Sequence, residues 1–345
     1  YTQLLVDEGY IPDPKKKKRY PWHMENLYCT WGDQNAYARW EAKKTNKPKR
    51  NALYLLDEKM VRDAAAVILR EKLPITTILI DAGWHQDMGE YVAHTERFPN
   101  LRGLIDDLHE MGFRVILWVN LGDIWEGAKV DPRFLFPDGY TNQYGGPEYD
   151  YSNPLVQEEY LKPMVRRIIS DAPGCYNADG IKTDFWAGKV QPQMPLYDPQ
   201  WRGEANYTYR MTKIMVEEMR SIKSDACHIG MHCHPYLAQY MDVIRTYDVL
   251  FSNPYEHQAR GELTEHLAPG CPSVLDLHNF IENAPLYFEV AQKYSCGIEL
   301  GAVLSMIDDF FTEDNPVPAD AAYYEMLRKG LELTKEMPEK WRTDF

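Results

Sequence analysis

The sequence has few cysteines, and their spacing excludes two common kinds of cysteine site. Six cysteines occur in 345 residues, and no two of them form a Cys-x-x-Cys pair. A zinc ribbon and a thioredoxin-like redox motif both require that pair. Neither motif is therefore supported, and nothing in the spacing dictates disulfide bonds.

Long apolar runs and an excess of basic residues are also missing. No stretch approaches the roughly 20 apolar residues of a membrane-spanning helix, and the N-terminus does not resemble a signal peptide. We therefore expect a soluble chain without a membrane partner. Its compartment can be the cytoplasm, the periplasm or the extracellular space. The formal net charge is −14, which repels a phosphate backbone and argues against a nucleic-acid partner. The one basic run, Lys15–Arg19, lies between prolines and is typical of a solvated loop.

Length and composition fit one large domain. Hydrophobic residues make up 44% of the chain, enough for a sizeable core. Residues 1–25 are predicted to be an irregular lead-in from a missing N-terminal domain. Residues 26–345 show no break in composition and are predicted to form a single catalytic barrel. Because the chain begins at Tyr1 rather than at methionine, we expect a trimmed piece of a longer protein.

Eight predicted strands alternate with helices or loops. The strands are predicted at residues 26–31, 76–80, 114–120, 181–186, 228–233, 248–252, 273–277 and 297–304. Helices are predicted at 57–71, 104–111, 153–170, 204–223, 237–244, 282–293 and 319–336, with a polar loop over 33–57. This alternation predicts an α/β fold, a (β/α)8 TIM barrel. The alternative, a doubly wound sheet, predicts a Gly-rich turn after the first strand, and Trp31-Gly32-Asp33-Gln34 is not one.

The stretch Gly180-Ile181-Lys182-Thr183-Asp184 carries the strongest functional signal. Side chains alternate along a strand, so Lys182 and Asp184 are predicted to share one face. Burying both charges is unfavourable unless they are paired or functional. A structural salt bridge is one interpretation. We favour the other, a site at the mouth of a barrel, where strand ends supply catalytic groups.

Carboxylates and indoles gather at the other predicted strand ends. The full set is Trp31, Asp81, Trp84, Trp118, Asn120, Lys182, Asp184, Trp186, His232, His234, Asp248, Asp276 and Asn279. Aromatic faces stack on the C–H surface of a sugar, and polar groups fix its hydroxyls. The pattern predicts a carbohydrate site. Asp276 and Asn279 stay outside it because they can simply stabilise a loop, and Trp118 also fits a core position.

Two carboxylates, Asp184 and Asp248, are the candidates for cleaving a glycosidic bond. Retaining glycosidases hold a nucleophile and an acid/base about 5–5.5 Å apart, and inverting ones about 6.5–9.5 Å apart. The sequence does not give this distance. Lys182 is expected to keep Asp184 ionised as the nucleophile, which leaves Asp248 as the acid.

Five motifs carry a family resemblance. They are Cys29-Thr30-Trp31-Gly32, Asp81-Ala82-Gly83-Trp84, Phe98-Pro99-Asn100-Leu101, Gly180-Ile181-Lys182-Thr183-Asp184 and Ile244-Arg245-Thr246-Tyr247-Asp248-Val249. In this order they resemble the catalytic barrel of clan D glycoside hydrolases, over about residues 26–305. The chain looks most similar to the melibiase-type α-galactosidases of family 36. The α-glucosidase and α-xylosidase branch, family 31, comes next.

The resemblance implies a retaining α-glycosidase that acts through a covalent glycosyl–aspartate intermediate, without a cofactor or a metal. α-Galactosides are the expected substrates, with α-glucosidase, α-xylosidase or α-N-acetylgalactosaminidase specificity as alternatives. One hydroxyl contact is missing, because Asp81-Ala82 replaces the Asp-Asp common in relatives. The implied roles are nucleophile for Asp184, acid/base for Asp248, substrate binding for Asp81, Lys182, Trp31, Trp84, Trp118, Trp186, His232 and His234, and partner of the acid for Arg245.

Two functions of other classes stay open. His232-Cys233-His234 on a strand would place both imidazoles on one face, as in a zinc-dependent hydrolase. Barrel amidohydrolases, however, carry that pair on the first strand, and here it falls on the fifth. The second possibility is a barrel that binds sugar without catalysis. The oligomeric state stays open.

Overall fold

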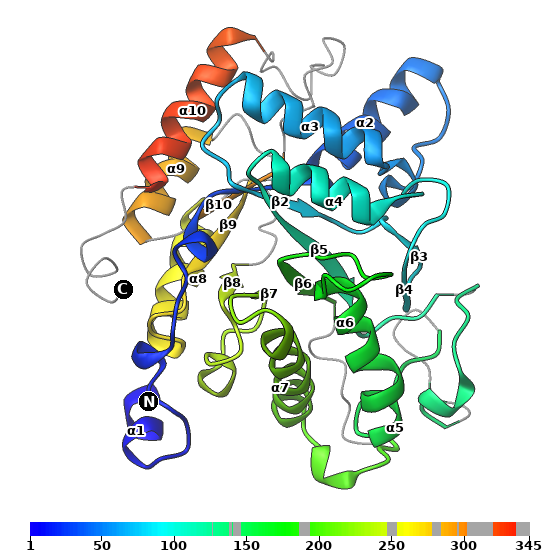
Figure 1. The fold of residues 1–345 in the computed structure, drawn as a ribbon. Helices are drawn as coiled ribbons and strands as arrows, with labels where there is room; N and C mark the ends of the chain where they lie inside the picture. Colours follow the sequence, from blue (N-terminus) through cyan, green and yellow to red (C-terminus); the bar gives the residue numbers. More distant parts are fainter. Residues whose placement is uncertain are drawn as a thin grey trace.

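Eight parallel strands close into a barrel in the computed structural model, which describes residues 1–125, 127–137, 140, 146–185, 194–246, 254–277, 284–294, 297–301 and 320–335 (Figure 1). The order around the barrel is β1, β2, β5, β6, β7, β8, β9, β10 and back to β1. The prediction of a (β/α)8 TIM barrel is confirmed. The barrel strands are β1 (Leu27–Cys29), β2 (Thr77–Ile80), β5 (Arg114–Asn120), β6 (Gly180–Asp184), β7 (Cys227–Gly230), β8 (Val243–Arg245), β9 (Ser273–Leu277) and β10 (Gly297–Leu300).

Helices surround the barrel (Figure 1). They are α1 (Thr2–Asp7), α2 (Thr30–Thr45), α3 (Glu58–Arg70), α4 (Leu101–Glu110), α5 (Pro154–Val156), α6 (Lys162–Ile169), α7 (Glu204–Ile222), α8 (Pro254–Leu267), α9 (Ala284–Tyr294) and α10 (Ala321–Lys335). The start predicted for α3 is confirmed, because Asp57 caps it by accepting a hydrogen bond from the amide of Met60 at 2.8 Å. Among the described helices, none is both long and apolar enough to cross a membrane.

Helix α2 occupies residues that the sequence analysis assigned to a strand end and a loop, and that assignment is wrong. Strand β1 ends at Cys29, which is also the N-cap of α2 and makes no side-chain capping bond. The usual Ser, Thr, Asp or Asn start signal is therefore absent. The first turn packs directly on the backbone after β10, because a Cβ at Gly32 would lie only 1.9 Å from the carbonyl oxygen of Gly301.

Strand β8 lies in a segment that was predicted to be helical, residues 237–244, and that prediction is also wrong. Val243 and Ile244 pair with β7 on one side, and Ile244 and Arg245 pair with β9 on the other. The preceding residue, Asp242, accepts a hydrogen bond from the amide of His228 at 2.9 Å. These contacts between segments override the local helical pattern. The strand predicted at 248–252 lies outside the described residues.

Besides α2 and β8, helices α1 and α8 were not predicted. Nor were the two strands of a small antiparallel hairpin, β3 (His85–Asp87) and β4 (Glu90–Ala93). The hairpin follows β2 at the carboxyl end of the barrel, and Met88, between its two strands, lines the site described below.

The N-terminal residues pack against the barrel rather than forming a wholly irregular segment. The hydroxyl of Thr2 donates to the carbonyl oxygen of His266, near the end of α8, at 3.0 Å. In the basic run, Lys17 turns inward and its Nζ lies 2.8 Å from Asp242 Oδ1, so the solvated-loop prediction fails at this residue. Burial alone would raise the pKa of Asp242, but Lys17 and Arg220 hold it well below its usual value.

Candidate active site

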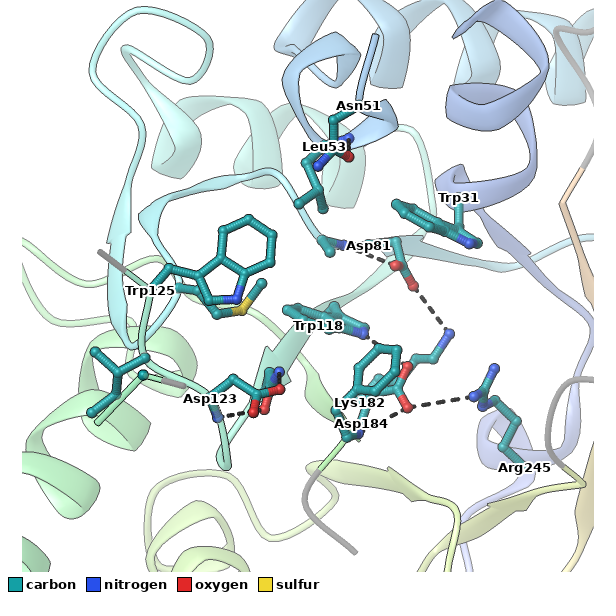
Figure 2. A pocket seen from close by; sticks show the side chains of 16 residues that line it. Trp31, Asn51, Leu53, Asp81, Trp118, Asp123, Trp125, Lys182, Asp184 and Arg245 are labelled. Atoms are coloured by element: carbon teal, nitrogen blue, oxygen red, sulfur yellow. Dashed lines mark hydrogen bonds and ion pairs between the residues drawn. The ribbon is translucent and has the colours of Figure 1, made fainter. Parts of the chain in front are cut away.

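A cavity of about 750 Å³ opens at the carboxyl ends of the barrel strands (Figure 2). In a barrel of this type the groups at strand ends converge on one mouth. The lining residues are Trp31, Asn51, Leu53, Asp81, Ala82, Met88, Trp118, Asn120, Asp123, Ile124, Trp125, Gly146, Lys182, Asp184, Phe185 and Arg245. These residues lie at or just after the ends of five barrel strands, β1, β2, β5, β6 and β8, or in the loops near them. Side chains from several strand ends therefore meet in one cavity, as predicted.

Asp184 ends β6 and is almost entirely buried at the cavity floor. The indole Nε1 of Trp118 donates to Asp184 Oδ2 at 3.3 Å. On the other oxygen, Oδ1, the Nη2 of Arg245 lies at 3.5 Å and the amide of Phe185 donates at 3.0 Å. Donors on both oxygens fix the orientation of the carboxylate (Figure 2).

The residue after Asp184 has an unusual backbone conformation. Phe185 has φ of 56°, in the left-handed region, and its side chain is 43% exposed at the cavity wall. A bulky side chain in this region costs about 1–3 kcal/mol, and such strain concentrates at functional sites. The turn directs the Phe185 amide back onto the Asp184 carboxylate, so the strained residue contributes directly to the site.

The Lys182 ammonium pairs with two carboxylates other than Asp184. Its Nζ lies 3.0 Å from Asp81 Oδ2 and 2.7 Å from Glu299 Oε1, deep in the barrel. Burial opposes the charged form, but the two carboxylates more than offset it and raise the pKa of Lys182 well above its usual value. Within the described part of the chain, Arg245 is the cation paired with Asp184. Lys182 is thus paired with Asp81 and Glu299, and its effect on the ionisation of Asp184 stays a prediction.

Asp81 is held by the start of α2. The hydroxyl of Thr30 accepts a hydrogen bond from the Asp81 amide at 3.0 Å and donates to Gln34 Oε1 at 2.8 Å. The amide group of Gln34 donates in turn to the carbonyl oxygen of Ala82 at 2.9 Å. The unpredicted helix thus fixes the backbone on which Asp81 stands.

Residues 48–228, just over half of the chain, match the TIM-barrel domain of glycosyl hydrolases family 31. The chain belongs to family 31. Over 88 residues it is also 30% identical to alpha-glucosidase 2 of Bacillus thermoamyloliquefaciens, a stretch that covers 25% of this chain and 10% of that protein. Of the two resemblances drawn from the motifs, the family 31 branch is supported, and the closer likeness to family 36 is not confirmed.

Solved structures share the fold of this family 31 barrel. A cycloalternan-degrading enzyme of Trueperella pyogenes, in complex with a covalent intermediate, has a TM-score of 0.67 at 14% identity, over 97% of this chain and 49% of its own. An α-galactosidase of Lactobacillus brevis gives 0.64 at 13%, over 90% and 40%. A dextranase of Flavobacterium johnsoniae, complexed with glucose, gives 0.62 at 17%, over 94% and 42%. The chain thus spans less than half the length of each.

The aromatic residues predicted to wall the site fall in three different places. Trp31 and Trp118 line the cavity of the family 31 barrel, although Trp31 stands in the first turn of α2 rather than on a strand. Trp84 is fully buried outside the lining, where its Nε1 donates to the carbonyl oxygen of Trp118 at 2.8 Å. Trp186 lies outside the described residues, as does Asp248.

His232 and His234 stand apart from the cavity lining. Strand β7 ends at Gly230, so the two imidazoles are not on a strand face, contrary to the premise of the zinc hypothesis. His234 instead begins a short turn, where its Nδ1 accepts a hydrogen bond from the amide of Tyr236 at 3.2 Å. Burial lowers the pKa of His232 to about 4, which keeps it neutral at pH 7.

The described residues contain two groups with metal-ligand spacing, and neither includes those histidines. One group is His23, Cys227 and Asp242, and the other is Cys29, Asp81 and Glu299. Cations of the protein already lie at both. Lys17 pairs with Asp242 in the first group, and Lys182 lies against Asp81 and Glu299 in the second.

Several residues that form the site were not predicted from the sequence. Asp123 and Trp125 follow β5 and line the cavity. Asn120, which ends β5, donates to Asp123 Oδ2 at 2.8 Å and accepts from the Asp123 amide at 3.1 Å. Asp123 and Trp125 could have been predicted, because an Asp and a Trp follow the apolar strand directly in Asn120-Leu121-Gly122-Asp123-Ile124-Trp125. Glu299 was a second such signal, because a charged residue inside an apolar strand requires a partner or a function, as Lys182 does.

Proposed function

We propose that this family 31 barrel hydrolyses α-glycosides with retention, with Asp184 as the nucleophile and Asp248 as the acid/base. The observation that carries the proposal is the buried Asp184 carboxylate, held at the cavity floor by Trp118 and Arg245. Such a group is oriented before substrate binds, which is what a nucleophile on a rigid strand requires. The role of Asp248 rests on its sequence motif.

The reaction proceeds in two displacements. Asp184 attacks the anomeric carbon while Asp248 gives its proton to the departing glycosidic oxygen, and a glycosyl–aspartate ester forms. Asp248 then removes a proton from water, whose oxygen attacks the same carbon and releases Asp184. Two inversions give net retention. Asp81 and Lys182, at the cavity floor, bind hydroxyls of the sugar, and Trp31 and Trp118 contact its C–H faces.

For the sugar, we propose α-glucosides as the first substrate class and α-galactosides or α-xylosides as the second. Membership of family 31 and the 88-residue stretch shared with a bacterial alpha-glucosidase support this order. The sequence-based preference for galactose depended on the resemblance to family 36, which is not confirmed, so α-galactosides take second place.

Nitrophenyl α-glucoside, α-galactoside and α-xyloside provide the test, with anomeric configuration of the product followed by NMR. Asp184→Asn should lower kcat by about 10⁴-fold with the fold intact. Asp179→Asn is the matched control, because Asp179 precedes the same strand at the opposite end of the barrel. With azide, Asp184→Gly should give the β-glycosyl azide and Asp248→Gly the α-glycosyl azide.

Four results would contradict the proposal. Near wild-type turnover by Asp184→Asn removes the nucleophile assignment, and an inverted product removes the retaining mechanism. Sugar binding without turnover by the wild type indicates a non-catalytic barrel. Activity that disappears with EDTA and returns with zinc would instead favour the metal-dependent class.

A further inference from the structure

Glu299 stands in the barrel interior, behind the cavity. It lies on β10 with a fully buried side chain, and it is absent from the cavity lining. Its partner Lys182 comes from β6, which is four strands away from β10 in the closed order of eight. The two strands therefore face each other across the barrel. The Lys182–Glu299 ion pair, at 2.7 Å, spans the interior from one wall to the other.

The Lys182 ammonium is shared between two carboxylates. Its Nζ contacts Asp81 Oδ2 at 3.0 Å and Glu299 Oε1 at 2.7 Å, and the Sγ of Cys29 lies at 3.9 Å. The two carboxylate contacts use two of the three N–H donors of an ammonium group. Burial keeps the Cys29 thiol protonated by raising its pKa well above the usual value, so Cys29 adds no charge. Arg245 also acts on Lys182, and its effect is repulsive.

Without Glu299, Lys182 would have a competing partner nearby. Lys182 and Asp184 are two residues apart on β6, so both side chains point to the same face of the strand. A lysine side chain is long and flexible enough to move between neighbouring carboxylates. An ammonium group bound to Asp184 would occupy the oxygen that must attack the sugar.

We propose that Glu299 is a positioning residue for the reaction, one that holds Lys182 Nζ against Asp81 and away from Asp184. Asp81 and Lys182 then present a fixed acceptor and donor to the sugar hydroxyls. Asp184, oriented by Trp118 and Arg245, stays open to the anomeric carbon. This inference rests on the proposed glycosidase function and adds to it a residue outside the cavity.

Glu299→Gln tests the inference, because it keeps the size of the side chain and removes the charge. We expect kcat/KM on the preferred nitrophenyl α-glycoside to fall about tenfold or more. Labelling of Asp184 by a 5-fluoro-α-glycosyl fluoride, followed by intact mass, should slow in parallel. With one carboxylate fewer around Lys182, the alkaline limb of the pH profile should move to lower pH. Glu299→Asp restores the charge and should return that limb toward the wild-type position.

The outcomes separate this inference from the proposed function. No turnover by the wild type overturns both. Wild-type turnover combined with an unchanged rate and pH profile in Glu299→Gln overturns the positioning role alone. If Glu299→Gln does not fold, the kinetics of Glu299→Asp distinguish a positioning role from a role in folding alone. Its carboxylate is retracted by one methylene, so a positioning role predicts a several-fold loss of kcat/KM, whereas a role in folding alone predicts wild-type kcat/KM in the folded variant.

Discussion

Arg245 Nη2 lies 3.5 Å from Asp184 Oδ1 and links the last residues of β8 and β6 across the cavity floor. Both side chains are almost entirely buried, so little solvent screens the pair. Removing one partner of a buried charge pair leaves the other uncompensated, and we expect Arg245→Met to lower kcat/KM by about 10- to 100-fold. Arg245→Lys keeps the charge but shortens the reach, so its loss should be smaller. Steady-state kinetics on nitrophenyl α-glycosides measures both.

Arg114→Met is the control for that series, since Arg114 begins β5 and pairs with Asp179 at the far end of the barrel. It should leave kcat/KM unchanged in the folded protein. A wild-type kcat/KM in Arg245→Met would show that the ion pair does not serve catalysis.

Trp118 and Trp84 form a natural pair for separating catalysis from stability. Trp118 Nε1 donates to Asp184, whereas Trp84 Nε1 donates to a backbone carbonyl beneath it. Trp118→Phe should lower kcat by about tenfold, because a charge-assisted bond to the nucleophile disappears. Trp84→Phe should instead lower the free energy of unfolding by about 1–3 kcal/mol, since a buried carbonyl loses its donor. Urea unfolding and kinetics on both variants check this, and a raised KM in Trp84→Phe would restore the subsite role inferred from sequence.

The parts of the barrel that sequence could predict are those with strong local signals. Strands β5 and β9 are continuous runs that coincide with their predicted bounds. Lys182 and Asp184 stood out because charges inside a buried strand require an explanation, and both line the cavity. Local patterning thus located the site as well as the fold.

The remaining features depend on contacts that a sequence does not display. Strand β8 forms because β7 and β9 supply partners on both sides, whatever the local helical pattern. The partner of Lys182 could not be predicted for a related reason. Asp184 lies two residues away in the sequence, whereas Glu299, which pairs with Lys182, lies 117 residues away on the opposite side of the closed barrel. Closure of the sheet, rather than any motif, creates that contact.

Asp179 supports a prediction about stability and pH at the end of the barrel opposite the cavity. Its carboxylate accepts hydrogen bonds from His109 Nε2 at 2.7 Å, Val115 N at 2.9 Å and Arg114 Nη1 at 3.1 Å. Burial opposes ionisation, but the His109 hydrogen bond and the other contacts hold the pKa below its usual value of 3.8. The contribution of Asp179 is therefore fully present above pH 4 and is lost as pH falls through the lowered pKa, because the unfolded chain takes up the proton first.

Asp179→Asn should lower the free energy of unfolding by about 1–3 kcal/mol at pH 7, where the charged acceptor of these three donors disappears. The difference from wild type should shrink below about pH 4, since the wild-type carboxylate then loses its own advantage. Urea titrations followed by tryptophan fluorescence at pH 7 and pH 3 measure it. Asp107→Asn is the matched control, because Asp107 pairs with Arg62 on the surface, and its effect should stay within about 0.5 kcal/mol. A difference for Asp179→Asn that stays constant between the two pH values would show that the hydrogen bonds, not the charge, provide the stability.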